Sequence, residues 1–291
     1  MSKPTIAIIG PGNIGRDLVI KLCRSPNLSI LGLIGRNYGT SSEEFAARSN
    51  VPYYGSGISE YLEYHANTNI FIDATTAECH AYHCSSLEHC NAYLIDLTPS
   101  GMGIIYSPIA SPSLPIRGTS ISLVSCGGQA SLPLLASLGK YFSHLEYIEI
   151  VSSMASLAVG PATRSNIDEY IITTQNAINK LVSPDGVKVM LNINPANPPV
   201  TMKTTINLVG DTDYSLEELT SVARKVEASV REYCPGYSIN IPPLFMSDGR
   251  LVTMVQIQGA GDYLPTYAGN IDIINSACVK LCEEIAYSCM I

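Results

Sequence analysis

Residues 5–22, TIAIIGPGNIGRDLVIKL, decide the fold of the first part of the chain. A short run rich in β-branched residues is followed at once by three glycines in the pattern G-x-G-x-x-G, and then by apolar residues at helical spacing. In this order, Gly10 makes a tight turn, Gly12 admits a pyrophosphate to the backbone, and Gly15 lets helix and strand pack closely. The stretch predicts a dinucleotide-binding βαβ unit whose helix N-terminus faces the phosphates.

Further strand-like runs follow, separated by helix-like segments. They are Leu28–Ile34, Ile70–Ala74, Tyr93–Leu97 and Ile121–Ser125. This alternation predicts an α/β fold with a doubly wound parallel sheet. Where an acid would accept the adenosine ribose 2′-hydroxyl, the chain reads Gly35-Arg36-Asn37. Arg36 therefore leaves both NAD and NADP open, because it could meet a 2′-phosphate, lie over adenine or face solvent.

Composition narrows the class of function. With 291 residues, of which 46% are hydrophobic and 14% charged, the chain can form a large core shared by two domains. A net charge of −8 without a basic run argues against nucleic acid and anionic membrane surfaces as partners. No run approaches the roughly 18 apolar residues of a membrane span, and no signal-peptide core begins the chain. We expect a cytoplasmic protein that acts on small molecules.

The nine cysteines are odd in number and lack disulfide-scaffold spacing, so reduced thiols are expected. Residues 78–90, ECHAYHCSSLEHC, hold three histidines and three cysteines, which are metal-capable types. No second ligand-rich cluster completes a site, and such residues on an outer helix commonly pack or face solvent. The sequence therefore predicts no metal.

Cys126 stands out from the other cysteines. In residues 124–132, VSCGGQASL, it lies between an apolar run and a glycine pair that opens a helix. The positive end of a helix and its free N–H groups lower a thiol pKa, and the same groups could stabilise an oxyanion. Cys126 is the predicted nucleophile, and the other eight are expected to be buried and inert, with Cys278 and Cys282 in the helix that begins near Asn270.

A thiolate beside a nicotinamide has a natural combined chemistry. The thiolate adds to an aldehyde, the thiohemiacetal gives up a hydride, and the resulting thioester passes its acyl group to an acceptor. The reverse reaction reduces an acyl thioester to an aldehyde.

Six blocks, in this order, carry a resemblance to a known family: AIIGPGNIGRDL, IDLTPSGMG, VSCGGQASLPLL, GPATRSNIDEYIITT, NPANPP and GAGDYLPTYAGNIDI. The chain resembles the CoA-acylating acetaldehyde dehydrogenases that partner a 4-hydroxy-2-oxovalerate aldolase. The resemblance implies a Rossmann domain of residues 1–125 completed by residues 262–291, and a central α+β catalytic and dimerisation domain of residues 126–261. It also implies coenzyme A as acyl acceptor or donor, a homodimer and an aldolase partner.

The resemblance assigns roles to individual residues. It makes Cys126 the acyl-thioester nucleophile. The residues that it places at the cofactor are Pro11, Gly12, Asn13, Ile14, Ala158, Val159, Gly160, Pro161, Ala162, Thr163, Arg164, Ser165, Asn166 and Asn270. From the residues alone, Asn166 is predicted to cap the helix IDEYIITTQNAINKL, and Gly160-Pro161 to end a strand.

The chain departs from the family pattern where an aspartate is implicated in orienting or activating the cysteine. That place reads Lys203-Thr204 here. A threonine cannot act as a carboxylate base, so Cys126 would rely on the helix terminus, a water or another acid. Asp262 is one candidate for that acid, and the alternative is that it is a turn residue.

Other departures bear on the acyl acceptor. Ala162 replaces a glycine, Leu157 stands where a lysine is expected, and the segment between Tyr237 and Val252 is shorter than in the family. These changes favour a carrier-protein thioester as substrate or altered aldolase contacts. Thr204 leaves open a catalytically degenerate dinucleotide-binding subunit of an aldolase complex. A semialdehyde dehydrogenase with phosphate as acceptor would need basic residues near Cys126, for which the sequence offers only Arg164 and Lys203.

The C-terminal half predicts an antiparallel or mixed sheet. Its strand-like runs are Val187–Ile193, Thr205–Val209 and Leu251–Ile257, with a helix over residues 216–233. Such a sheet has one face to cover, which favours packing against the cofactor domain or a second subunit. The apolar stripe of the last helix predicts that it closes the first domain.

Overall fold

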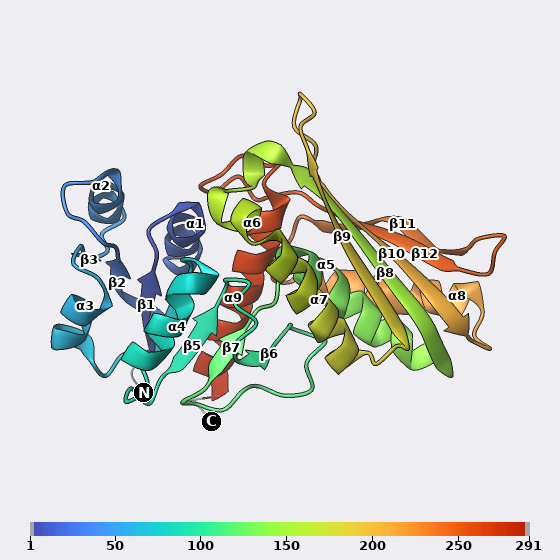
Figure 1. Cartoon of the computed structure of the whole chain (residues 1–291), viewed down its shortest axis with the longest axis horizontal. Helices are drawn as coiled ribbons and strands as arrows, with labels where there is room; N and C mark the ends of the chain where they lie inside the picture. Colours follow the sequence, from blue (N-terminus) through green and yellow to red (C-terminus); the bar gives the residue numbers. More distant parts are fainter. Residues whose placement is uncertain (1–2, 289–291) are drawn as a thin grey trace.

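A parallel sheet forms one half of the molecule (Figure 1). Over residues 3–288, the part of the chain that the computed structural model describes, it has seven strands in the order β3-β2-β1-β4-β5-β7-β6; for Pro161 and Ala162 only the backbone is described. In that order they are β3 (Tyr53–Tyr54), β2 (Ser29–Ile34), β1 (Thr5–Ile9), β4 (Ile70–Asp73), β5 (Tyr93–Asp96), β7 (Ser120–Ser122) and β6 (Ile104–Ile105). The chain order reverses beside β1, which opens a crevice at the carboxyl ends of the strands.

Helices cover both faces of this sheet. They are α1 (Asn13–Leu22), α2 (Ser41–Arg48), α3 (Ile58–His65), α4 (Ala77–Ser86) and α9 (Gly269–Ser288). Apolar residues of α1 and α9 pack with Ile6 and Ile8 of β1 on one face, whereas Ile58 and Tyr61 of α3 pack with Ala7 and other residues on the opposite face. The predicted doubly wound α/β fold is confirmed.

The glycine turn between β1 and α1 has the predicted geometry. Gly10 has a φ of +103°, which an L side chain rarely adopts, and its N–H donates to the Ile34 carbonyl at 3.0 Å. A Cβ at Gly15 would lie 1.9 Å from the Gly10 carbonyl oxygen, so only glycine allows helix and strand to approach this closely. No described atom lies within 4 Å of a Cβ built at Gly12, which leaves the backbone open there.

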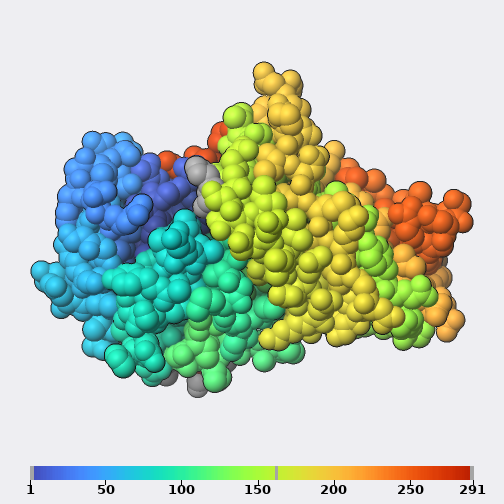
Figure 2. Space-filling view, in the orientation of Figure 1, coloured from blue at the N-terminus to red at the C-terminus, as the bar shows by residue number. Residues whose placement is uncertain are grey.

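A second, mixed sheet forms the other half (Figure 1). Its order is β11-β12-β10-β8-β9, and β8 and β9 are the parallel pair within it. The strands are β11 (Tyr237–Phe245), β12 (Leu251–Ile257), β10 (Met202–Asp211), β8 (His144–Ala155) and β9 (Gly186–Asn194). The connection between β9 and β10, which passes from one side of β8 to the other, projects from the body of the molecule (Figures 1 and 2). The three predicted strands are confirmed, and β8 and β11 were not predicted.

Both omissions have a physical reason. β11 contains Pro242 and Pro243, which cannot donate to a ladder, and a strand with prolines is tolerated at a sheet edge. β8 alternates buried and half-buried residues from Ile148 to Met154, and the prediction missed this period-2 pattern. Only the end of a strand was expected here, at Gly160-Pro161, and β8 ends earlier, at Ala155.

Helices cover one face of the second sheet. They are α5 (Cys126–Leu138), α7 (Ile167–Leu181) and α8 (Leu216–Arg231), with the short helices η1 (Gly139–Tyr141), η2 (Ser156–Ala158) and α6 (Pro161–Ser165) in the connections. Side chains of α5 meet inward-facing residues of β8 and β10, such as Ile150 and Ile206, in one apolar core. Along residues 3–288, no helix combines the length and apolar character needed to cross a bilayer.

The cysteines are less uniformly buried than predicted. Cys234, Cys278 and Cys282 are buried, but Cys23 is exposed and the cysteines on and just after α4 are only partly buried. The expectation of eight buried cysteines is therefore wrong for the first half of the chain, because its helices have narrower apolar faces than α9. Cys289 lies outside the described residues.

Candidate active site

A cavity of about 860 Å³ lies between the crevice of the parallel sheet and the start of α5. The predicted site residues that line it are Gly10, Pro11, Gly12, Asn13, Ile14, Arg36, Cys126, Ala158, Gly160, Thr163, Asn166 and Asn270. Residues more than 250 positions apart thus form one wall. The glycine turn, the end of β2 and the Cys126 thiol share a single space.

Several predicted residues lie elsewhere. Gly15 is buried beneath Gly10, and Val159 belongs to the apolar core behind the cavity. The Arg164 guanidinium donates to the carbonyls of Val159 and Ser156, so it stabilises its own loop. Ser165 is exposed outside the wall. The side chains of Pro161 and Ala162 lie outside the described part of the structure.

Cys126 is the first residue of α5. Ser125 caps the helix by accepting a hydrogen bond from the Gly128 N–H at 2.9 Å. The preceding Val124 has a φ of +66°, a left-handed conformation that is unusual for a β-branched residue. This sharp turn between strand and helix presents the half-buried Cys126 to the cavity.

The electrostatic balance at Cys126 differs from the prediction. Burial raises the pKa of its thiol to about 11, and hydrogen bonds from the Tyr170 hydroxyl and from backbone N–H groups at the helix start oppose that rise. The helix terminus thus acts in the predicted direction, but the expectation of a lowered pKa is wrong, because desolvation of the thiolate outweighs it.

Tyr170 of α7 is the contact that the sequence analysis missed. Its hydroxyl oxygen lies 3.9 Å from Cys126 Sγ and accepts a hydrogen bond from the Gly127 N–H at 3.0 Å. The buried face of α7 comprises Tyr170, Thr173, Thr174, Ala177 and Ile178. That helical spacing could have been recognised in the sequence, and a buried tyrosine hydroxyl requires a polar partner. The sequence does not show that this partner is at Cys126 and Gly127.

Thr204 and Asp262 have different surroundings. Thr204 is buried on β10, and its hydroxyl lies 3.0 Å from that of Ser152 on β8. The Asp262 carboxylate lies 2.7 Å from the Lys21 ammonium and also contacts Arg24, outside the cavity wall. The suggestion that Asp262 assists Cys126 is therefore wrong, because two cations hold this carboxylate beside α1.

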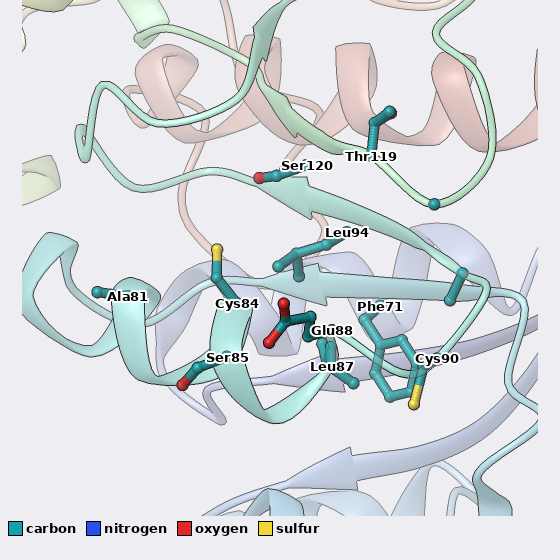
Figure 3. A pocket seen from close by; sticks show the side chains of 12 residues that line it. Phe71, Ala81, Cys84, Ser85, Leu87, Glu88, Cys90, Leu94, Thr119 and Ser120 are labelled. Carbon is teal, nitrogen blue, oxygen red and sulfur yellow. The ribbon is translucent and has the colours of Figure 1, made fainter.

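An acid–histidine cluster underlies the cavity at the ends of β4 and β5. Asp73 lies 2.9 Å from His80 Nδ1 and 2.7 Å from His83 Nδ1, and His80 Nε2 lies 3.3 Å from Cys84 Sγ. Cys84 also lines a second cavity beside α4 (Figure 3). Within residues 3–288, no three His, Cys, Asp or Glu side chains are arranged to hold a metal ion.

The buried Asp96 predicts a pH-dependent stability. Burial raises its pKa to about 6, against the influence of His80. An unfolded aspartate titrates near 4, so the folded state holds this proton more tightly, and the free energy of unfolding falls as pH rises from about 4 to 6, by up to about 3 kcal/mol. The raised pKa of His80 continues this loss above pH 6.5, because its imidazolium is stabilised by Asp73.

Urea unfolding at a series of pH values measures this effect. Asp96→Asn is expected to flatten the slope between pH 4 and 6, because it removes the group that titrates there. An equal fall in wild type and variant would show that Asp96 is not its source.

Comparisons with known proteins agree along the chain. Residues 126–265 match a family model described as prokaryotic acetaldehyde dehydrogenase, dimerisation. The chain is 38% identical over 286 residues to an acetaldehyde dehydrogenase of Pectobacterium atrosepticum, covering 98% of this chain and 96% of that protein. It is 36% identical over 287 residues to one from Brevibacillus brevis, covering 98% and 97%.

A solved structure has the same fold. It is the aspartate semialdehyde dehydrogenase with NADP from Candida albicans, with a TM-score of 0.65 and 10% identity, covering 97% of this chain and 99% of that one. At this identity the match concerns the arrangement of the two sheets alone.

Proposed function

We propose that this chain, which belongs to the prokaryotic acetaldehyde dehydrogenase family, interconverts a short-chain aldehyde and an acyl thioester with NAD or NADP through a Cys126 thioester. One observation carries the proposal: Cys126 opens a helix in the wall of the cavity that also contains the glycine turn. The nucleophile and the proposed dinucleotide site therefore line the same cavity. Thioester formation with hydride transfer requires this, because the hydride must pass from the carbon bound to Cys126 to the cofactor.

The residues present fit a dinucleotide. The first N–H groups of α1 have no intrahelical acceptor, Gly12 offers no side-chain cap, and the space beside it is open. Asn270 donates through Nδ2 to the Ala158 carbonyl at 3.0 Å, whereas its buried Oδ1 has no hydrogen-bond partner among the described residues. We assign the phosphates to Pro11, Gly12, Asn13 and Ile14, and a polar donor of the cofactor to Asn270.

The reaction uses these groups in order. The Cys126 thiolate adds to the aldehyde carbonyl, and the backbone N–H of Cys126 at the start of α5 would donate to the oxyanion of the thiohemiacetal, because the Gly127 and Gly128 N–H groups already donate to Tyr170 and Ser125. A dinucleotide held at the glycine turn by Pro11, Gly12, Asn13 and Ile14 would supply the acceptor for the hydride of the former carbonyl carbon. Coenzyme A then loses its thiol proton to water in the cavity, its sulfur attacks the carbonyl carbon of the Cys126 thioester, and the C–S bond to Cys126 breaks to release the cysteine thiolate. All steps are reversible.

We infer the domain organisation from the same packing. The proposed dinucleotide domain comprises residues 1–125 and 262–291, because α9 packs against α1. The proposed catalytic and dimerisation domain comprises residues 126–261, nearly the span of the matched dimerisation model. One face of its sheet carries only half-buried residues on β8 and β12, which suits contact with a second copy in a homodimer.

The test is an assay with acetaldehyde, either cofactor, and coenzyme A or an acyl-carrier protein. We expect absorbance of the reduced nicotinamide with coenzyme A, and a mass increase of one acetyl group on the Cys126 peptide when the acceptor is omitted. Arg36 is the residue at the ribose end of the cavity, so comparing NAD with NADP measures its role. No turnover with any cofactor or acceptor would favour a degenerate subunit of an aldolase complex.

A further inference from the structure

We propose that Tyr170 is a catalytic residue that donates its hydroxyl hydrogen to the Cys126 thiolate, and that Ser152 and Thr204 are positioning residues that hold this hydroxyl in place. The inference rests on the proposed function of Cys126. Under this proposal, neutral hydroxyl groups of the protein stabilise the Cys126 thiolate in place of a carboxylate.

The hydrogen bonds at the Tyr170 hydroxyl oxygen indicate that this hydroxyl is a donor to Cys126. A phenol has one hydrogen to donate and can accept two. The Gly127 N–H donates to this oxygen at 3.0 Å. Burial raises the pKa of Tyr170 and the Ser152 hydroxyl opposes that rise, as a hydrogen-bond donor to its oxygen does, and a Cβ on Gly127 would contact both groups. If Ser152 donates here, both acceptor positions of the Tyr170 oxygen are used. The remaining hydrogen is available for Cys126 Sγ, 3.9 Å away.

Ser125, which also lies near the Tyr170 hydroxyl, is engaged elsewhere. Thr174 donates to the Tyr170 backbone carbonyl at 2.7 Å, so its oxygen must accept in the 2.7 Å contact with Ser125. The Ser125 hydrogen is thus used, and its oxygen accepts from the Gly128 N–H. Ser152 remains as the hydroxyl that orients Tyr170.

Thr204 completes the chain of hydroxyls. Ser152 and Thr204 are direct partners in the β8–β10 ladder, and their side-chain oxygens lie 3.0 Å apart in the interior. If Thr204 donates to Ser152 and Ser152 donates to Tyr170, each hydroxyl hydrogen in this series points toward Cys126. Aligned donors of this kind polarise one another in a buried setting.

The close packing around Gly127 supports a specific arrangement of the Tyr170 and Ser152 hydroxyls. A Cβ added to Gly127 would lie 2.1 Å from the Tyr170 oxygen and 2.7 Å from Ser152 Oγ. Only glycine at this position lets both hydroxyls approach the start of α5. The glycine after Cys126 therefore makes room for the Tyr170 and Ser152 hydroxyls.

The groups around Cys126 are otherwise uncharged. Ser152 of β8 and Thr204 of β10 are buried outside the cavity wall, and α9 presents Asn270 and apolar residues to the cavity. The charged or titratable side chains elsewhere in the wall are Arg36, Tyr53, Glu78, Cys79 and His83. None of these is a direct contact of the thiol, so Tyr170 is the titratable group that faces it.

Tyr170 acts as a donor and not as a base. Burial raises the pKa of its phenol well above 10, so it keeps its hydrogen at physiological pH. When the Cys126 S–H bond breaks, its proton passes to water in the open cavity and the electron pair stays on sulfur. Tyr170 then donates to that sulfur and offsets part of the desolvation cost.

The test measures alkylation of Cys126 by iodoacetamide as a function of pH, read from the mass of its peptide. Tyr170→Phe keeps the ring and removes the donor, and is expected to raise the apparent pKa of Cys126 by about one to two units. Ser152→Ala should shift it in the same direction by less. With acetaldehyde, Tyr170→Phe should lower kcat about 10- to 100-fold and leave KM nearly unchanged.

The matched control is Tyr237→Phe. This buried hydroxyl donates to the Ala130 carbonyl of the same helix without contacting Cys126, so its removal should leave the alkylation profile unchanged. A wild-type alkylation profile in Tyr170→Phe, or an equal shift in Tyr237→Phe, overturns the proposal. Because alkylation needs neither aldehyde nor cofactor, a shift in a protein that lacks turnover would sustain Tyr170 and refute only the proposed function.

Discussion

Replacing Cys126 with alanine is expected to lower aldehyde oxidation by about 10⁴-fold or more, because the reaction then lacks the atom that carries the acyl group. The substitution removes one half-buried sulfur, so the free energy of unfolding should change by about 1 kcal/mol or less. Dinucleotide binding, measured by calorimetry, should be retained, since the glycine turn is on a different element.

Cys79 provides the matched control. It is a partly buried cysteine that lines the same cavity from α4. Cys79→Ala should retain turnover within a few-fold of wild type and should still form the acyl adduct on the Cys126 peptide. Activity that survives in Cys126→Ala but not in Cys79→Ala would reassign the nucleophile to α4.

Replacing Lys21 with methionine is expected to destabilise the protein by about 3–5 kcal/mol. The Lys21 ammonium is 9% exposed and lies 3.1 Å from Asp17, 2.7 Å from Asp262 and 2.8 Å from Asp272. Without the Lys21 ammonium, three carboxylates lie close together where little solvent can screen their repulsion. Because these acids belong to α1, the loop after β12 and α9, the loss should loosen the attachment of the C-terminal helix.

Chemical denaturation followed by circular dichroism measures the loss. Arg24→Met is the control, because Arg24 contacts the same Asp262 but is 61% exposed, and an exposed pair contributes about 1 kcal/mol or less. Equal, small losses in both variants would mean that solvent screens the cluster around Lys21. A loss confined to Lys21→Met would show that burial makes this cluster structural.

The parallel sheet was predictable because its signals are local. A β-branched run, a glycine turn and a helical repeat within residues 5–22 each limit the backbone by sterics alone, and the structure confirms them. The edge strand β11 was not predictable in the same way. Its prolines oppose a strand unless the position in the sheet is known, and that position depends on pairing with β12.

In the candidate site, too, locally signalled features were predicted and long-range contacts were not. Cys126 was identified from its own neighbours, because the start of a helix is a local feature of the sequence. The suggestion that Asp262 assists Cys126 was wrong, because the partners of that carboxylate are Lys21 of α1 and Arg24 just after α1, more than 200 residues earlier. A charge pattern in one dimension does not show which opposite charge will neutralise it.

The sequence by itself determined the parallel sheet, the glycine turn and the identity of the candidate nucleophile, since the pattern that signals each strand, turn or helix start lies within a short stretch of the chain. Only the tertiary structure decided what surrounds that nucleophile. Tyr170 of α7 contacts Cys126, and Ser152 of β8 and Thr204 of β10 are buried nearby, because these elements pack around α5. Hydrogen bonds and desolvation act over a few ångströms in space, so the environment of a thiol is set by packing and not by its position in the chain.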